Sequence, residues 1–267
     1  MIPKKIHYCW FGDKPLPLSA KKCIESWKKY FPDYEIIEWN EKNFDVNFNL
    51  YAKQAYDLKK FAFFTDVARL YIIYKYGGIY FDVDVEVIKK YDDVLNNDAF
   101  FGLESKGVVA TGLGFGAVKR NWIIKEMLDD YNNREFIDSN NNQNLTPCPI
   151  LNSLIFKRNS FKLNGNFEKI KGVAIYPAIY FNPKGSYGGT LNINDNTLSI
   201  HHYDGSWYTK ESIKRAKVLN KVYKIFGKKF GIIIYSTIFL PFRVVSNIKE
   251  RGIKNSFLKI YLKFKKS

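Results

Sequence analysis

The sequence predicts an α/β domain with a mainly parallel sheet, because short apolar runs alternate with segments of helical periodicity. The first run, residues 5–11, stops at a Gly-Asp-Lys-Pro turn and is typical of a strand. A helix is expected over residues 19–31, where apolar side chains recur every three or four positions before Pro32. Residues 34–39 then predict a second strand.

A long helix is expected over residues 59–76, closed by Gly77 and Gly78. The β-rich run of residues 79–85 follows. A further strand and a further helix continue the alternation, and a looped region follows them. The strand is expected over 100–103, the helix over 121–131 and the looped region over 176–203.

Composition supports an ordered chain with a sizeable core. The 267 residues are 46% hydrophobic and include 22 Phe and 19 Tyr, which argues against disorder. The three cysteines lie far apart, so neither a disulfide framework nor a structural zinc site is indicated. The apolar stretch at the amino terminus is too short for a signal-peptide core, and we expect a cytoplasmic protein.

The net charge of +16 is concentrated at the carboxyl end. Residues 210–267 hold sixteen Lys or Arg against two acids, a net +14, which leaves +2 for residues 1–209. A near-neutral body argues against a nucleic-acid partner. We therefore expect a catalytic domain over 1–209 and a basic, amphipathic helical tail over 210–267.

The tail has an apolar centre, residues 230–240, which ends at Pro241. This run is shorter than the ~20 residues of a spanning helix, and basic residues flank it on both sides. The pattern favours an interfacial helix on an anionic membrane, at the inner face of the cell membrane. The alternative is a helix that packs on the body of the protein.

The Asp82-Val83-Asp84 motif is the centre of the functional prediction. If the segment is a strand, alternate residues point to the same side, and both carboxylates face one pocket. Such a pair is stable with a cation between the carboxylates, and oxygen ligands suit Mn²⁺ or Mg²⁺, which in turn bind a diphosphate. The plainer reading is a loop with two solvated acids.

Asp66 and Arg69 provide a second polar pair. They lie three residues apart in the predicted helix 59–76 and so share one face. Their neighbours are nearly all apolar or aromatic, which indicates a polar cavity rather than an ordinary surface ion pair.

Three motifs in order resemble glycosyltransferase family 32, a group that includes bacterial capsule and polysaccharide glycosyltransferases. They are IPKKIHYCWFG at residues 2–12, FTDVAR at 64–69 and YGGIYFDVD at 76–84. The resemblance extends over about residues 1–208. It implies a GT-A-like, Rossmann-like fold, a UDP- or GDP-sugar donor, a divalent cation and retention of anomeric configuration. The implied acceptor is a glycan or a lipid-linked glycan of capsule or cell-surface polysaccharide.

The resemblance also implies roles for individual residues. Trp10 is expected to stack on the nucleotide base, Asp66 to bind donor sugar hydroxyls, and Arg69 to hold the sugar or diphosphate. Asp82 is expected near the ribose, the sugar and the metal, and Asp84 as a direct metal ligand.

The segment 201–207, HHYDGSW, is expected to close this site. His202 is the first choice as a further metal ligand, with His201 second and Asp204 as a rival. Ser206 and Trp207 match a Ser-Trp pair that contacts the donor phosphates.

One segment departs from the family pattern, and two other functions compete. Cys148 stands where many relatives have the glycine of a Thr-Gly-Pro motif, and Asn152 is a candidate sugar contact. A metal-dependent nuclease or nucleotidyl transferase would also use Asp82 and Asp84, but it favours a basic body. A non-catalytic membrane-surface adaptor would use the tail alone and leaves the polar residues above unexplained.

Overall fold

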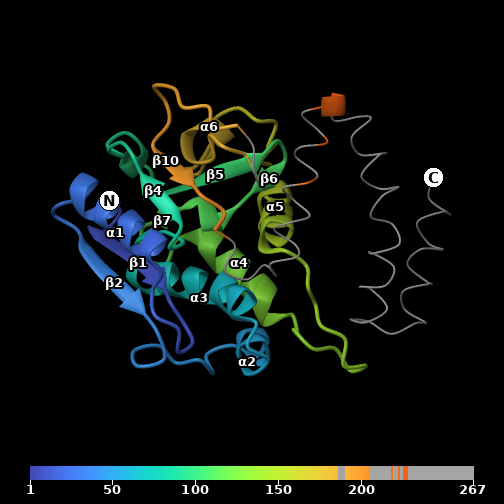
Figure 1. The fold of residues 1–267 in the computed structure, drawn as a ribbon. Helices are drawn as coiled ribbons and strands as arrows, with labels where there is room; N and C mark the ends of the chain where they lie inside the picture. Colours follow the sequence, from blue (N-terminus) through green and yellow to red (C-terminus); the bar gives the residue numbers. More distant parts are fainter. Residues whose placement is uncertain (186–189, 205–217, 219–221, 223–224, 228–267) are drawn as a thin grey trace. The chain divides into compact units, whose positions relative to one another are not determined.

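The computed structural model describes residues 1–185, 190–204, 218, 222 and 225–227 (Figure 1). The chain separates into two units, Met1–Trp207 and Tyr208–Ser267. Nearly all of the second unit lies outside the described residues, and with it the predicted helical tail.

The described part of the first unit alternates helices and strands. The helices are α1 (Leu18–Tyr30), α2 (Leu50–Asp57), α3 (Phe61–Tyr76), α4 (Trp122–Asn132), α5 (Cys148–Arg158) and α6 (Ala178–Phe181), with 3₁₀ turns η1 (Val94–Asn96) and η2 (Thr111–Leu113). The strands are β1 (Lys5–Cys9), β2 (Glu35–Trp39), β3 (Gly78–Tyr80), β4 (Val85–Val87), β5 (Ala99–Ser105), β6 (Val108–Val109), β7 (Phe115–Ala117), β8 (Glu168–Ile170), β9 (Val173–Tyr176) and β10 (Ser199–His201).

The main sheet has the order β2-β1-β3-β7-β5-β9-β8, and β6 pairs with the outer part of β5. Strands β2, β1, β3, β5 and β9 run in one direction, while β7, β8 and β6 run against them. The predicted α/β class is therefore confirmed, with a mixed sheet whose main direction is parallel. A separate antiparallel pair joins β10 to β4.

Two apolar cores cover the two faces of the sheet. One core packs α2, α3, α4 and α5 against the sheet, and the other packs α1, α6 and the region of β4 (Figure 1). Neighbouring strand residues alternate between them, as with Phe100 in one core and Phe101 in the other. The result is a layered domain in which the sheet lies between two groups of helices.

Most of the predicted helices and strands are present, and their ends lie within four residues of the predicted ends. Gly77 ends α3 with a positive φ of 64°, and its N–H donates to Ile73. Asn121 caps α4, since its side chain accepts the N–H of Ile123. Helices α2 and α5 were not predicted.

The expected strand over residues 79–85 is wrong in one respect. The strand ends at Tyr80, the chain turns through residues 83 and 84, and a new strand begins at Val85. The N–H of Val85 donates to the carbonyl of Asp82 at 3.0 Å, which closes the turn. Asp82 and Asp84 thus lie on a tight connection between β3 and β4, not on a continuous strand.

Helix α1 fixes the far side of this connection. The indole Nε1 of the fully buried Trp27 donates to the carbonyl of Val85 at 2.7 Å. The hydroxyl of Ser26 accepts the N–H of Val87 at 2.9 Å. Both bonds attach α1 to β4, so the turn that carries the two aspartates is held where it enters β4.

Buried His7 fixes the near side, where β1 approaches β3. Its Nε2 lies 2.9 Å from the carbonyl of Gly77, and its Nδ1 accepts the indole N–H of Trp39 at 3.0 Å. A Cβ on Gly78 would lie only 2.7 Å from the carbonyl of Lys5. The second glycine is therefore required by the close approach of the two strands as well as by its φ of 106°.

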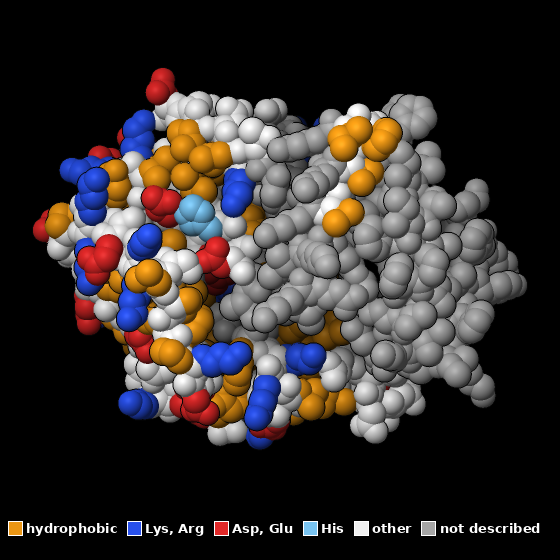
Figure 2. All heavy atoms as spheres, in the orientation of Figure 1, with side chains coloured by type: hydrophobic (Ala, Val, Ile, Leu, Met, Phe, Trp, Pro, Cys, Tyr) orange, Lys and Arg blue, Asp and Glu red, His pale blue; other side chains and the backbone are white. Residues whose placement is uncertain are grey.

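The surface of the described part mixes both signs of charge. On the face drawn in Figure 2, acidic and basic side chains are interspersed, and a histidine lies beside acidic groups. The mixture of charges on this face agrees with the near-neutral body. Among the described residues, no helix is both long and apolar enough to cross a bilayer.

Candidate functional site

The candidate site lies at the carboxyl edge of the parallel strands β2, β1 and β3. Asn40, Trp10 and Asp82 each follow the end of one of these strands, within two residues. In open α/β sheets this edge is where ligands bind. Three segments that are distant in sequence thereby supply neighbouring side chains.

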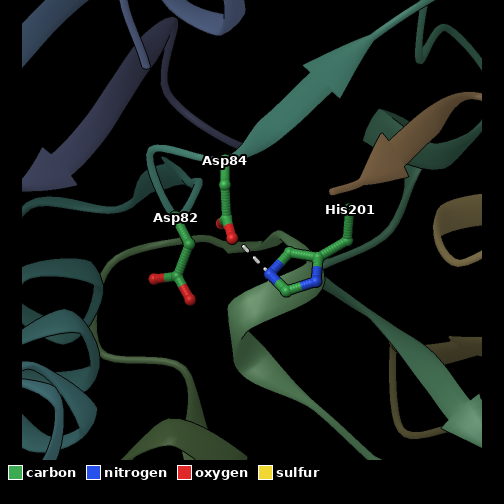
Figure 3. A group of neighbouring side chains, drawn as sticks. All are labelled: Asp82, Asp84 and His201. Atoms are coloured by element: carbon green, nitrogen blue, oxygen red, sulfur yellow. Dashed lines mark ion pairs between the residues drawn. The ribbon is translucent and has the colours of Figure 1, made fainter. Parts of the chain in front are cut away.

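Asp82, Asp84 and His201 converge at this edge, as Figure 3 shows. One ligand atom from each residue lies within 4.8 Å of the other two. Asp82 and Asp84 come from the turn between β3 and β4, and His201 ends β10, which pairs with β4 in the register His201–Val85. The β4–β10 pairing thus brings His201 to a motif more than a hundred residues earlier.

Asp84 is the most strongly held of the three. Its Oδ1 lies 3.1 Å from Nε2 of His201, and its Oδ2 accepts the N–H of Asp204 at 3.0 Å. Burial acts to raise the pKa of Asp84, but His201 and these hydrogen bonds outweigh it and lower the pKa. The carboxylate is therefore kept ionised, as a metal ligand must be.

Asp82 faces the adjoining helix α3. Its Oδ2 lies 3.4 Å from Nη1 of Arg69, and its Oδ1 accepts the hydroxyl of Tyr80 at 3.0 Å. Burial and the nearby charge of Asp84 raise its pKa, while Arg69 opposes this shift. A Cβ on Gly112 would lie 2.5 Å from Oδ2 of Asp82. The missing side chain at Gly112 therefore makes room for this carboxylate.

Asp66 and Arg69 form a buried ion pair on α3. The two side chains are 11% and 5% exposed, and Nη2 of Arg69 donates to Oδ1 of Asp66. Burial raises the pKa of Asp66 to about 6, although Arg69 and Cys148 act to lower it. Arg69 thus bridges Asp66 and Asp82, and the predicted polar pair adjoins the two-aspartate motif.

His202, the first choice among the histidines, lies elsewhere. Its Nε2 is 2.8 Å from Oε2 of Glu86, and its backbone N–H donates to the carbonyl of Asp84. Residues 201 and 202 point to opposite sides at the end of β10, so only one of them faces the aspartates. The structure places the second choice, His201, in the cluster instead. Asp204 contributes its backbone N–H rather than its carboxylate.

The three side chains fit a divalent cation. Two carboxylates and one imidazole form a donor set suited to Mn²⁺, and less to Mg²⁺, which prefers oxygen alone. The Nε2 of His201 faces the carboxylates, whereas its buried Nδ1 has no hydrogen-bond partner within the described part of the chain. Asp82, Asp84 and His201 are thus the residues that would hold the ion.

Trp10 borders an open pocket of about 800 Å³ on the same edge. Its indole Nε1 donates to the carbonyl of Lys14 at 2.6 Å, which fixes the ring. Phe61, at the start of α3, also lines the pocket and packs on Gly12, where a Cβ would meet the ring at 2.9 Å. Phe61 was not predicted, because an aromatic residue in an apolar helix resembles any core residue.

The remaining candidates have different outcomes. Cys148 is buried at the start of α5 and interacts with Asp66. Asn152 is also buried and donates to the hydroxyl of Thr111 at 3.2 Å, beside Gly112. Ser206 and Trp207 lie outside the described residues, so their predicted contacts with phosphate stay predictions.

A family comparison agrees with this geometry. Residues 17–101 match the family model described as a glycosyltransferase sugar-binding region containing a DXD motif. This segment includes the Asp66–Arg69 pair and the Asp82-Val83-Asp84 motif. Residues 17–101 thus match that glycosyltransferase region, and the resemblance predicted from the motifs is confirmed there.

Two curated relatives are mannosyltransferases of Schizosaccharomyces pombe. Inositol phosphoceramide mannosyltransferase 1 is 25% identical over 149 residues, which cover 51% of this chain and 45% of the relative. Inositol phosphoceramide mannosyltransferase 3 is 32% identical over 127 residues, or 43% of this chain and 33% of the relative. The matched segments thus span less than half the length of either relative.

Solved glycosyltransferase structures show weaker similarity. The PaToxG glycosyltransferase has a TM-score of 0.44 at 18% identity, over 59% of this chain and 69% of that one. The galactosyltransferase LgtC has a TM-score of 0.40 at 14% identity, over 81% of this chain and 94% of that one. At these scores the matches add no argument beyond the topology described above.

Proposed function

We propose that the chain is a metal-dependent glycosyltransferase that moves a sugar from a nucleotide-sugar donor to an acceptor hydroxyl. The observation that carries this proposal is the convergence of Asp82, Asp84 and His201 beside the buried Asp66–Arg69 pair. The family match over residues 17–101 supports the class of enzyme.

The order of features along the sheet edge suits an extended donor. The Trp10 pocket follows β1, and the cation site follows the adjacent strand β3. A base between Trp10 and Phe61 leaves the diphosphate at the cation site and the sugar at Asp66 and Arg69. Aromatic rings stack on nucleobases, and carboxylates accept hydrogen bonds from sugar hydroxyls.

The chain's own residues account for much of the chemistry. Arg69 is positively charged and prearranged by two carboxylates, so it stabilises negative charge that develops on the departing diphosphate. Asp66 orients the donor sugar through its hydroxyls. A bound Mn²⁺ would supply further charge neutralisation at the diphosphate.

We also propose that configuration is retained. Asp66 and Asp82 are both engaged by Arg69, and Asp84 by His201, so none of these three carboxylates is free to act as a nucleophile. The family resemblance implies retention, and attack by the acceptor on the face from which the diphosphate departs gives that outcome without a protein nucleophile. The departing phosphate takes the acceptor proton.

The cellular setting is a proposal from the sequence. A tail with a net +14 charge and an apolar centre suits an anionic membrane surface, at about 1 kcal/mol per basic residue near it. A cytoplasmic enzyme at the inner face of the cell membrane would then meet a glycan or lipid-linked acceptor. Capsule or other cell-surface polysaccharide is the proposed product.

A variant of the central motif tests the proposed function. Asp84→Asn keeps the size of the side chain but removes the charge. We expect donor hydrolysis and transfer to fall at least about 100-fold, with the thermal midpoint retained. Glu25→Gln, a surface variant on α1, serves as the control. Full Mn²⁺-dependent activity in the folded Asp84→Asn variant would overturn the proposal.

A further inference from the structure

The residues that line the Trp10 pocket indicate which nucleobase the donor carries. This inference rests on the proposed function. Two glutamates of the pocket, Glu38 and Glu41, lie at and just after the end of β2. Asn40 is the single amide side chain among the lining residues of the described part, and its Nδ2 donates to Oε1 of Glu38 at 2.9 Å. The other neutral side-chain donors of the lining are engaged as well, since the hydroxyl of Tyr56 donates to Glu41 and the indole of Trp10 donates to the carbonyl of Lys14. Glu38 and Glu41 add carboxylates to the same lining.

Glu41 is held in a defined orientation. Its Oε1 accepts two hydrogen bonds, from the N–H of Gly12 at 2.7 Å and from the hydroxyl of Tyr56 at 3.0 Å. Within the described part of the chain, no hydrogen bond reaches Oε2. The same Gly12 packs on Phe61 and lies two residues after Trp10, so Glu41 is hydrogen-bonded to a residue that adjoins both aromatic side chains. The open oxygen thus belongs to a carboxylate that is fixed beside the proposed base position.

The common bases differ in what they present to such a group. Guanine offers two adjacent donors, its ring N1–H and its exocyclic amine, next to a carbonyl oxygen. Uracil offers a single N–H between two carbonyl oxygens, which a carboxylate repels. Adenine offers an amine beside an unprotonated ring nitrogen. Ionised acceptors form strong hydrogen bonds to N–H groups, and an acceptor left facing another acceptor is costly.

We infer that the donor is a guanosine diphosphate sugar, and that Glu41 selects the base by accepting its N–H donors. Lys14, Lys42 and Lys59 also line the pocket, and lysine ammonium groups suit the guanine carbonyl and the phosphates. A pocket of about 800 Å³ accommodates a purine. Discrimination by one good pair of such bonds corresponds to about ten-fold or more in affinity.

Calorimetric titration of the full chain in the presence of Mn²⁺ tests this assignment. The ligands are the diphosphates of guanosine, uridine, adenosine and inosine, the last of which lacks the exocyclic amine. We expect guanosine diphosphate to bind at least about ten-fold more tightly than the uridine and adenosine compounds, with inosine diphosphate weaker than guanosine diphosphate.

Glu41→Gln tests the residue. The amide places N–H donors opposite the donors of guanine. We therefore expect the affinity for guanosine diphosphate to fall about ten-fold and the affinity for uridine diphosphate to change less than about two-fold. Glu41→Asp, which keeps the charge on a shorter side chain, is the second variant if Glu41→Gln unfolds. Glu25→Gln on α1 controls for loss of surface charge.

The outcomes separate the two proposals. Tighter or equal binding of uridine diphosphate would overturn the guanine assignment and leave the proposed function standing. A guanine preference unchanged in Glu41→Gln would overturn the role of Glu41. If no diphosphate binds the folded, Mn²⁺-supplied protein, both proposals fall.

Discussion

At the scale of single residues, Gly112 shows how tightly the site is packed. No role for Gly112 was predicted from the sequence. In the structure the space that a Cβ would fill at Gly112 is occupied by Asp82 at 2.5 Å and Arg69 at 3.2 Å. A residue without a side chain gives no chemical signal in a sequence, so this role emerges only from the fold.

Gly112→Ala is therefore expected to displace the Asp82 carboxylate and reduce transfer by about 100-fold. The protein should remain folded, because the added methyl group meets a side chain at the edge of the site. Donor turnover and the thermal midpoint measure the two effects. Gly107→Ala is the control, since a Cβ there meets nothing within 4 Å. Its positive φ costs about 1 kcal/mol in stability without touching the site. Equal turnover in the two variants would contradict the role of Gly112.

His7 supports a pH-dependent prediction. Burial lowers its pKa to about 4, with the Gly77 carbonyl opposing the shift, so the folded state holds the neutral ring. The unfolded chain binds a proton near pH 6.5. The contribution of the neutral His7 ring to the free energy of unfolding is thus complete above pH 6.5. It is lost as the pH falls from 6.5 toward 4, by about 3 kcal/mol.

Comparing denaturant unfolding of wild type and His7→Gln between pH 7.5 and 4 isolates this contribution from other titrating groups. The stability advantage of the wild type should shrink as the pH falls. An advantage that stays constant over this range would show that His7 does not titrate as described.

At the scale of elements, sequence periodicity predicted the helices that have one apolar face. Helix α1 and helix α4 fit this rule. Helix α3 is apolar on nearly all sides and was predicted from the spacing of its aromatic and aliphatic residues and from its terminal glycines. Helix α5 was not predicted, because its own apolar residues are not confined to one face and two of them, Ile150 and Leu154, are exposed. The short strands β7, β8 and β9 were missed because three or four residues carry too little periodicity.

The choice between His201 and His202 also belongs to this scale. Adjacent residues at a strand end point to opposite sides, so the answer depends on the register of β10 against β4. Register is set by long-range pairing, which no local pattern in this sequence encodes. The motif residues themselves were predictable because their spacing is local.

The attachment of α1 to β4 predicts a coupling between stability and the site. Trp27→Phe removes the N–H that reaches Val85 and leaves a buried carbonyl unpaired, at a cost of about 1–3 kcal/mol. The loosened turn should also weaken Mn²⁺ binding several-fold. Denaturant unfolding and metal titration measure the two effects.

Trp122→Phe is the matched control. The indole of Trp122, at the start of α4, donates to the backbone carbonyl of Lys171 and not to the β3–β4 turn. This variant should leave Mn²⁺ affinity unchanged within about two-fold. Equal losses of metal affinity in both variants would point to general destabilisation instead.

At the scale of the whole molecule, the core residues in the described part of the chain all belong to the first unit, residues 1–207. A chain truncated after Trp207 is therefore expected to fold and to bind donor nucleotide within about three-fold of the full chain. Binding to anionic vesicles should be lost with the basic tail, while neutral vesicles bind neither form. Sedimentation with vesicles checks this, and retained binding by the truncated chain would contradict the membrane role proposed for the tail.

The central claim is that Asp82, Asp84 and His201 hold a divalent cation for the donor diphosphate. Its most direct test is Mn²⁺ titration, followed by electron paramagnetic resonance, of wild type, His201→Ala and His202→Ala with saturating nucleoside diphosphate. We expect His201→Ala to weaken Mn²⁺ binding at least about ten-fold and His202→Ala to change it by less than about two-fold. The account would be contradicted if the wild type bound no Mn²⁺, or if His202→Ala lost the ion while His201→Ala kept it.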